Sequence, residues 1–99
     1  MTFEVKETDG ITCVVLAGEI DLEQSPAARR AVLDAIAHGT AVEVDLAEVS
    51  YIDSSGIASL VEGLQQARSQ GVDFTLTRIS DPVRKVLELA RLDRVFTVR

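Results

Sequence analysis

The sequence has few of the residues that form disulfide bonds, bind metals or act as catalytic bases. It has one cysteine, one histidine, two prolines, no tryptophan and six glycines among 99 residues. Cys13 has no partner for an internal disulfide, and its place in an apolar run indicates a buried free thiol. His, Cys, Asp and Glu residues do not follow the spacing of a metal site, and no glycine-rich phosphate loop is present. These absences argue against a disulfide scaffold, a metalloprotein and a nucleotide-dependent enzyme, so we expect no cofactor.

Positive charge and long apolar runs are also scarce. Ten basic residues stand against sixteen acidic ones, which gives a net charge of -6 at pH 7. Such a surface repels phosphate backbones and anionic lipids, so nucleic acid is not an expected partner. The apolar runs are far shorter than the about 18 residues of a membrane span, and the N-terminal stretch MTFEVKETDG lacks a secretory signal pattern. We therefore expect a cytoplasmic protein without direct membrane insertion.

What is present is the composition of an ordinary soluble domain, with 46% hydrophobic and 26% charged residues. A chain of this length can bury a core without staples. The sequence contains neither an internal repeat nor a linker. Residues 1–99 are therefore expected to form a single domain.

Four segments alternate in the manner of β-strands, and a fifth can add a short edge strand. Asp9-Gly10 supplies the turn of an N-terminal hairpin between the first two segments. In the third segment Val42, Val44 and Leu46 share one face, with acidic residues between them. The segments are FEVKET (3–8), ITCVVLAG (11–18), AVEVDL (41–46), VDFTLTR (72–78) and RVFTV (94–98).

Helical periodicity appears in three places between these strands. The first helix is expected to begin with Ser25 as its N-cap and Pro26 as its first helical residue. The second follows residues 53–56 and ends at Gly71, and the third opens at Asp81. The apolar stripes are Ala28, Val32, Ala35 and Ile36; Ile57, Leu60, Val61, Leu64 and Ala67; and Val83, Val86, Leu87 and Ala90.

Strands that alternate with helices should run parallel. Right-handed crossovers then place successive helices on the same face when the strand order follows the chain. The polar positions of the strands indicate that the other face is open to water. We predict an α/β fold with a mixed four- to five-stranded sheet and helices mainly on one face.

The string Asp53-Ser54-Ser55-Gly56 could hold a nucleophile, but a serine nucleophile needs a base within hydrogen-bond reach. The only histidine, His38, lies at the predicted end of the first helix, away from the carboxyl ends of the strands. Ile52 also stands where the nucleophile elbow of hydrolases has its first glycine. The sequence therefore predicts no enzyme activity.

Helix capping is a second interpretation of these residues, and Asp53, Ser54 and Ser55 are all possible caps. If Asp53 is the cap, Ser54 becomes the first helical residue and its hydroxyl points outward. A phosphate there would meet free backbone N–H groups at the positive end of the helix. It would also add negative charge beside Asp53 and near Asp21, which favours a switch that controls docking.

Three stretches resemble the STAS domains, and among them the anti-sigma factor antagonists of bacteria. They are Gly18-Glu19-Ile20-Asp21, the run VDLAEVSYIDSSGIASL (44–60) and the run ISDPVRKVLELARLDRVF (79–96). The resemblance implies the STAS fold and phosphorylation of the serine that follows the aspartate, Ser54. It also implies partner switching. The unphosphorylated protein binds an anti-sigma factor and releases sigma, that factor's serine kinase activity phosphorylates Ser54, and a phosphatase resets the switch.

The loops after strands two, three and four should gather at one edge of the sheet, because parallel strands carry their following loops at the same end. These loops are residues 18–24, 47–55 and 79–82. They predict an acidic docking surface for a basic partner. The expected partner-binding residues are Glu19, Asp21, Asp53, Ser54, Ser55 and Gly56.

A transporter subunit is the alternative that the resemblance leaves open. Ala58 stands where sporulation-type and stress-type members often carry glycine. The chain also ends at Arg99, where those members usually continue into another helix. Short STAS proteins occur as cytoplasmic subunits of lipid-trafficking ABC transporters, whose permease or ATPase would contact the same helix face.

Overall fold

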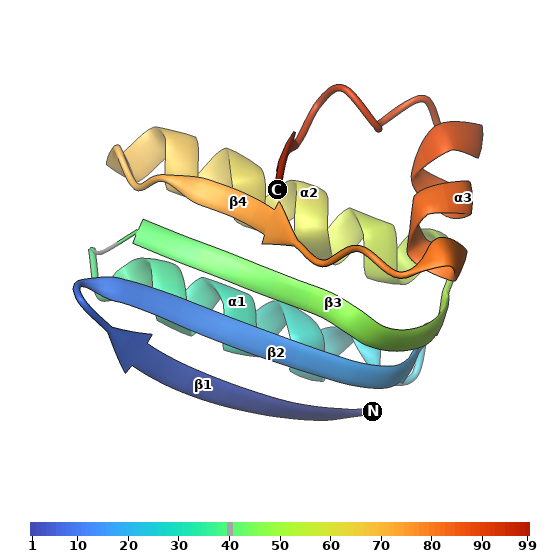
Figure 1. Cartoon of the computed structure of the whole chain (residues 1–99), viewed down its shortest axis with the longest axis horizontal. Coiled ribbons are helices and arrows are strands. Elements are labelled where there is room, and N and C mark those ends of the chain that lie inside the picture. The colour runs from blue at the N-terminus through green and yellow to red at the C-terminus, as the bar shows by residue number, and fades with distance from the viewer. Residues whose placement is uncertain (40) are drawn as a thin grey trace.

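The computed structural model describes residues 1–39 and 41–99, which form a five-stranded sheet with three helices (Figure 1). The strand order is β1-β2-β3-β4-β5; β1 and β2 are antiparallel, and the other neighbours are parallel. The predicted α/β architecture, including the final edge strand, is confirmed. The elements are β1 (Thr2–Thr8), β2 (Ile11–Ile20), α1 (Ser25–Ala37), β3 (Ala41–Ile52), α2 (Ser54–Gln70), β4 (Phe74–Thr77), α3 (Asp81–Leu89) and β5 (Thr97–Val98).

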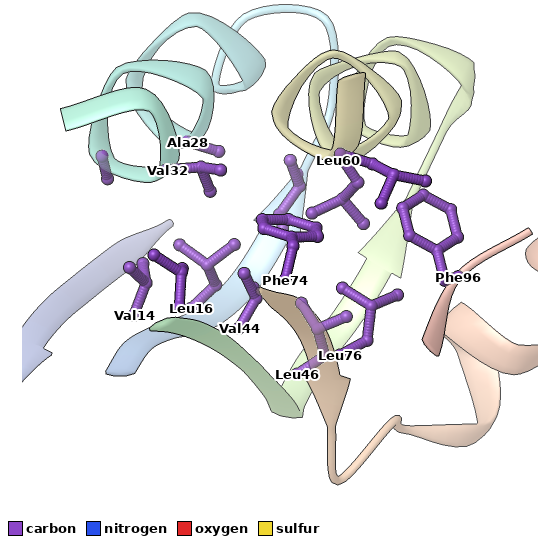
Figure 2. Packing of buried hydrophobic residues seen from close by; sticks show 14 of the residues in the cluster. Val14, Leu16, Ala28, Val32, Val44, Leu46, Leu60, Phe74, Leu76 and Phe96 are labelled. Atoms are coloured by element: carbon purple, nitrogen blue, oxygen red, sulfur yellow. The ribbon is translucent and has the colours of Figure 1, made fainter. Parts of the chain in front are cut away.

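Helices α1 and α2 lie side by side on one face of the sheet, as right-handed crossovers between sequential parallel strands require (Figures 1 and 2). The core fills the space between these helices and the sheet. In Figure 2, Val32 of α1 lies above Leu16 of β2, and Leu60 of α2 lies above Leu76 of β4. All three predicted stripes contribute buried residues to the core. Val61 and Val86 are only partly buried against it, and Ala90 is exposed because α3 ends at Leu89.

Strand β3 is longer than the sequence pattern indicates. Residues 47–52, predicted as part of a loop, continue the strand as far as Ile52. Its pairing with β2 shifts register twice, so that β3 carries extra residues and its simple alternation is lost. The shifts keep Val49 and Ile52 pointing into the core, where both are buried. The predicted loop 47–55 therefore shrinks to Asp53.

Helix α1 begins differently from the prediction. Gln24 occupies the N-cap position without a side-chain cap, and Ser25 is the first helical residue. The reason is the preceding turn, in which the carbonyl oxygen of Asp21 accepts the N–H groups of Gln24 at 3.1 Å and Ser25 at 2.7 Å. The Ser25 hydroxyl turns inward and donates to the Leu22 carbonyl at 3.3 Å. Ser25 is consequently buried rather than free to cap.

The face of the sheet opposite the helices carries polar residues, as predicted, but arginines cover part of it. Arg78 forms an ion pair with Asp45 at 3.3 Å, and Arg99 forms one with Glu43. The half-buried Cys13 lies on the same face, paired in register with Glu43. Burial, together with the nearby Asp45 and Glu43 carboxylates, raises the pKa of the Cys13 thiol. The cysteine is thus a half-buried, weakly reactive thiol.

Candidate phosphorylation and docking site

Helix α2 starts at a side-chain cap made by Asp53. One carboxylate oxygen, Oδ1, accepts the backbone N–H groups of Ser55 at 2.9 Å and Gly56 at 3.1 Å. The backbone of Asp53 is extended, as an N-cap requires. Of the possible caps that the sequence leaves open, the structure selects Asp53. Ser54 is therefore the first residue of the helix.

The second carboxylate oxygen of Asp53 reaches a different segment. Oδ2 accepts the N–H of Leu22, which lies in the loop between β2 and α1, at 3.1 Å. The Asp53 N–H in turn donates to the carbonyl of Ile20 at 3.3 Å. Asp53 thus links the loop after β2 to the start of α2, so the two segments lie side by side on one surface.

Ser54 and Ser55 differ in their exposure. Ser54 is exposed, and its hydroxyl makes no hydrogen bond with any other residue in the described part of the chain. Ser55 is half-buried, and its backbone carbonyl accepts the Ser59 hydroxyl at 3.1 Å. Of the two serines, Ser54 is the one that an enzyme can approach from solvent.

Gly56 has a packing role at this site. It is buried, and a Cβ atom there would lie 2.6 Å from Cγ1 of Ile52 and 2.8 Å from the carbonyl oxygen of Ile20. Neither the backbone of Ile20 nor the branched side chain of Ile52 can move away easily. The glycine allows the first turn of α2 to sit directly on the ends of β2 and β3.

The two acidic residues of the first loop are placed differently. Asp21 is half-buried, and its Oδ1 accepts the N–H of Gln24 at 2.9 Å, so the carboxylate closes its own turn. Glu19 is exposed at the end of β2, opposite Tyr51 of β3. Glu19 can therefore meet a partner freely, whereas Asp21 chiefly shapes the loop.

The third predicted loop lies apart from the first two. The N–H of Ser80 donates to the carbonyl of Leu46 at 3.3 Å, and its hydroxyl donates to that of Val49 at 2.7 Å. Strand β3 continues past these residues to Ile52 before α2 begins. The loop 79–82 is consequently held beside the middle of β3 rather than beside Asp53.

Two apolar residues of this surface have no counterpart in the sequence prediction. Leu22 is 73% exposed and Tyr51 is 49% exposed, although both lie next to predicted site residues. A shallow groove of about 560 Å³ also runs along α2 from Ser54 to Gln65, with the Arg29–Glu62 ion pair at its side. Leu22 is flanked by acidic and polar residues, and nothing in this part of the sequence indicates that the leucine is exposed. Large exposed apolar side chains at a surface of this kind are typical anchors for a protein partner.

His38 does not belong to this site. It is the C-cap of α1, at the opposite end of that helix from Ser25, and its Nδ1 lies 2.8 Å from the carbonyl oxygen of Asp34. The hydroxyl of Ser59, close to Ser54 in the sequence, lies near the Ser25 end, 3.3 Å from the Ser25 carbonyl. The histidine and Ser54 therefore stand at different ends of the helical layer.

Among the residues that the structure describes, no helix is long and apolar enough to cross a membrane. Within the same residues, no group of three or more His, Cys, Asp and Glu side chains is placed to hold a metal ion.

The fold and the site together define a small α/β domain that presents a capped helix start and an exposed serine to solvent. The family model described as the STAS domain matches residues 2–99. The chain therefore belongs to the STAS domain family.

Curated relatives match nearly the whole chain. The anti-sigma-B factor antagonist of Listeria monocytogenes serovar 1/2a is 29% identical over 102 residues, covering 100% of this chain and 89% of the relative. The anti-sigma-B factor antagonist of Bacillus subtilis strain 168 is 25% identical, covering 96% and 87%. These relatives are members of the antagonist group to which the sequence motifs pointed.

Solved structures agree with this fold. A crystal structure of an anti-sigma factor antagonist from Mycobacterium paratuberculosis superimposes with a TM-score of 0.89 at 26% identity, covering 98% of this chain and 83% of the other. The unphosphorylated form of the anti-sigma factor antagonist SpoIIAA gives a TM-score of 0.78 at 20% identity, with coverages of 99% and 88%. The second likeness concerns the fold alone.

Proposed function

We propose that this protein is an anti-sigma factor antagonist that works by partner switching in the cytoplasm. In its unphosphorylated form it binds an anti-sigma factor with serine kinase activity and so releases a sigma factor. Phosphorylation of Ser54 by that kinase ends the interaction, and a phosphatase restores it. The names of the relatives support this function over that of a transporter subunit. The protein acts by binding, and the chemistry belongs to its partners.

The observation that carries the proposal is the placement of Ser54. Its exposed hydroxyl lies at the first residue of α2, directly after the capping Asp53. A phosphoryl group there carries about 1.5 to 2 negative charges at neutral pH. It stands next to the Asp53 carboxylate and competes with it for the N–H groups of Ser55 and Gly56. The added group therefore disturbs the cap as well as the surface.

The disturbance reaches the neighbouring loop through Asp53. The carboxylate that caps α2 also holds the N–H of Leu22 at 3.1 Å. Repulsion by the phosphate pushes this carboxylate away from its present position and loosens Leu22, the most exposed apolar side chain of the docking surface. Phosphorylation thereby disturbs the position of an apolar anchor as well as the charge at the helix start.

Charge complementarity favours association with a particular partner, while close packing determines how stable the complex is. Glu19, Asp21 and Asp53 give the surface an acidic rim that attracts a basic partner surface. Basic groups would also attract a phosphate, so attraction alone cannot separate the two forms. A phosphate at Ser54 prevents close contact because the group is bulky and strongly hydrated. Two closely packed surfaces have no room for it, and removing its bound water costs free energy. In the unphosphorylated form, Ser54 and Ser55 let the partner approach the helix start, and Gly56 keeps that start against the sheet.

The phosphorylation step is tested by mapping the modified residue. The protein is incubated with ATP and the anti-sigma factor kinase of the same organism, and the site is read by tandem mass spectrometry. We expect one phosphate, on Ser54, that is lost in Ser54→Ala and kept in the matched variant Ser55→Ala. Phosphate on Ser55 with Ser54 unmodified would overturn the assignment of the switch residue.

A further inference from the structure

Strand β1 forms an edge of the sheet along its whole length (Figure 1). All seven of its residues are exposed, and among them Phe3 and Val5 are 48% and 49% exposed. The other edge strand, β5, has only two residues. A long edge strand presents unpaired backbone groups that can pair with another strand. Strand β1 is thus the more exposed of the two edges.

The hairpin turn determines which backbone groups of β1 point outward. Asp9 and Gly10 have φ values of 52° and 80°, which match the type I′ turn of a two-residue hairpin. The flanking pair, Thr8 and Ile11, is then a hydrogen-bonded pair, and hydrogen-bonded and non-hydrogen-bonded pairs alternate along the strands. The residues of β1 that turn their N–H and C=O groups outward are Phe3, Val5 and Glu7.

From this geometry we infer that two copies of this chain associate through antiparallel pairing of their β1 strands, centred on Val5. Hydrogen bonds then join Val5 to Val5 of the second copy, and Phe3 to Glu7 of the second copy on each side of the two-fold axis. All the outward backbone groups of β1 are used in this register. The interface is isologous, as in most homodimers.

The charges of β1 favour the same register. Glu4 and Lys6 lie on one face of the strand, where their side chains approach to 3.6 Å within one chain. In the pairing centred on Val5, Glu4 stands opposite Lys6 of the second copy, at the positions where facing side chains come closest. A shift by two residues places either Glu4 opposite Glu4 or Lys6 opposite Lys6. Only the central register pairs opposite charges, and this complementarity identifies a second copy as the partner.

The apolar side of β1 also gains cover. Phe3 and Val5 line an open cavity of about 280 Å³ against Ala27, Ala31 and Ala35 of α1. In the dimer the two Val5 side chains meet at the axis, and each Phe3 lies diagonally across from Val5 of the other copy. The interface is short and therefore weak compared with obligate dimers.

The β1 edge and the phosphorylated serine of the proposed switch lie in different parts of the molecule. Helix α2, which carries Ser54, lies on the far side of α1 from β1, over the other half of the sheet (Figure 1). Pairing of the β1 edges therefore leaves Ser54 and the start of α2 open on each copy.

Sedimentation equilibrium of the full chain tests the dimer. Measured between about 10 µM and 1 mM at about 0.15 M salt, the average mass should rise from the 10.7 kDa of one chain toward twice that value. Val5→Pro removes an outward N–H group without removing a bond to β2, and should abolish the rise. Its far-UV circular dichroism should match that of the wild type, which separates lost association from lost folding.

Charge variants test the register. Lys6→Glu should weaken dimerisation about tenfold or more, because it places like charges opposite each other twice. The swap Glu4→Lys with Lys6→Glu should restore the dissociation constant to within about threefold of the wild type. Lys85→Glu, an equal charge change on the exposed surface of α3, is the control and should have little effect. A monomer at every concentration, or a dimer unaffected by Val5→Pro and Lys6→Glu, would overturn the inference, and a swap as weak as Lys6→Glu would overturn the register.

Discussion

The carboxylate of Asp53 caps α2 and also binds the loop that contains Leu22. Two substitutions of Asp53 separate these roles. Asp53→Ala removes the bonds to Ser55, Gly56 and Leu22 together. Asp53→Asn keeps one side-chain oxygen that can still cap the helix. Its amide NH₂ group, however, faces the N–H of Leu22, and two donors cannot bond each other. The asparagine variant thus loses the link between the loops but keeps the cap.

The expected losses follow from these contacts. Replacing an aspartate N-cap by alanine costs about 0.5–2 kcal/mol, and a hydrogen bond such as that to Leu22 contributes about 0.5–1.5 kcal/mol. We expect the free energy of unfolding to fall by about 2–3 kcal/mol in Asp53→Ala and by about 1 kcal/mol in Asp53→Asn. In a domain of this size the melting temperature should fall by roughly 10–20 °C and about 5 °C respectively.

Urea denaturation followed by far-UV circular dichroism measures both losses. Asp93→Ala, which removes an exposed carboxylate with no hydrogen-bond partner in the described residues, is the matched control and should change stability by less than about 0.5 kcal/mol. Equal losses for Asp53→Asn and Asp53→Ala would refute the reasoning, because the cap would then contribute nothing. A loss in Asp53→Ala no larger than that in the control would refute it as well.

Three further predictions concern packing, pH and charge. Gly56→Ala should lower the free energy of unfolding by about 1–3 kcal/mol or more, because the new Cβ overpacks the site. Gly71→Ala should lower it by only about 1 kcal/mol, because no atom lies within 4 Å of the new Cβ and only the φ of 70° is unfavourable. Urea denaturation of both variants measures the difference. The Cys13 thiol has a raised pKa, so folding favours its protonated form. Its contribution to stability should be fully present below the unfolded-state pKa of about 8.5 and be lost as pH rises through the folded value. Cys13→Ser should lack that alkaline decline, and an unchanged curve would contradict the shift. Ser54→Asp should bind the partner more weakly than Ser54→Ala in calorimetry, because a fixed charge imitates part of the phosphate; equal affinities would contradict the switch.

The sheet and its helices were predictable because binary patterning repeats many times along the chain. The strands and the apolar stripes each rest on several residues, so single exceptions such as Ala90 do not alter the result. The Gly71 stop follows from local chemistry, whereas the sequence left three possible caps for α2, of which the structure shows Asp53. The alternating pattern did not predict the second half of β3. The pairing of β2 with β3 shifts register there, so Val49 and Ile52 are buried without following a period of two.

The sequence pointed to the centre of the candidate site but not to its connections. Asp53 was one of three possible caps, and Ser54 was proposed from the resemblance to the antagonists and from its expected exposure after an Asp53 cap. That one carboxylate also binds the N–H of Leu22, 31 residues away, depends on the tertiary arrangement of two loops. The same arrangement exposes Leu22 and gives the Asp21 carboxylate a local task, neither of which a sequence pattern records.

Isothermal titration calorimetry with the anti-sigma factor kinase of the same organism tests most directly whether phosphorylation of Ser54 controls binding. The unphosphorylated protein and the stoichiometrically phosphorylated protein are titrated under identical conditions, with Ser69→Ala, an exposed serine near the other end of α2, as the matched control. We predict that the phosphorylated form binds at least about thirtyfold more weakly, corresponding to the roughly 2 kcal/mol or more that an unmatched interfacial charge costs, while Ser69→Ala binds like the wild type. Equal affinities of the two forms would contradict the account.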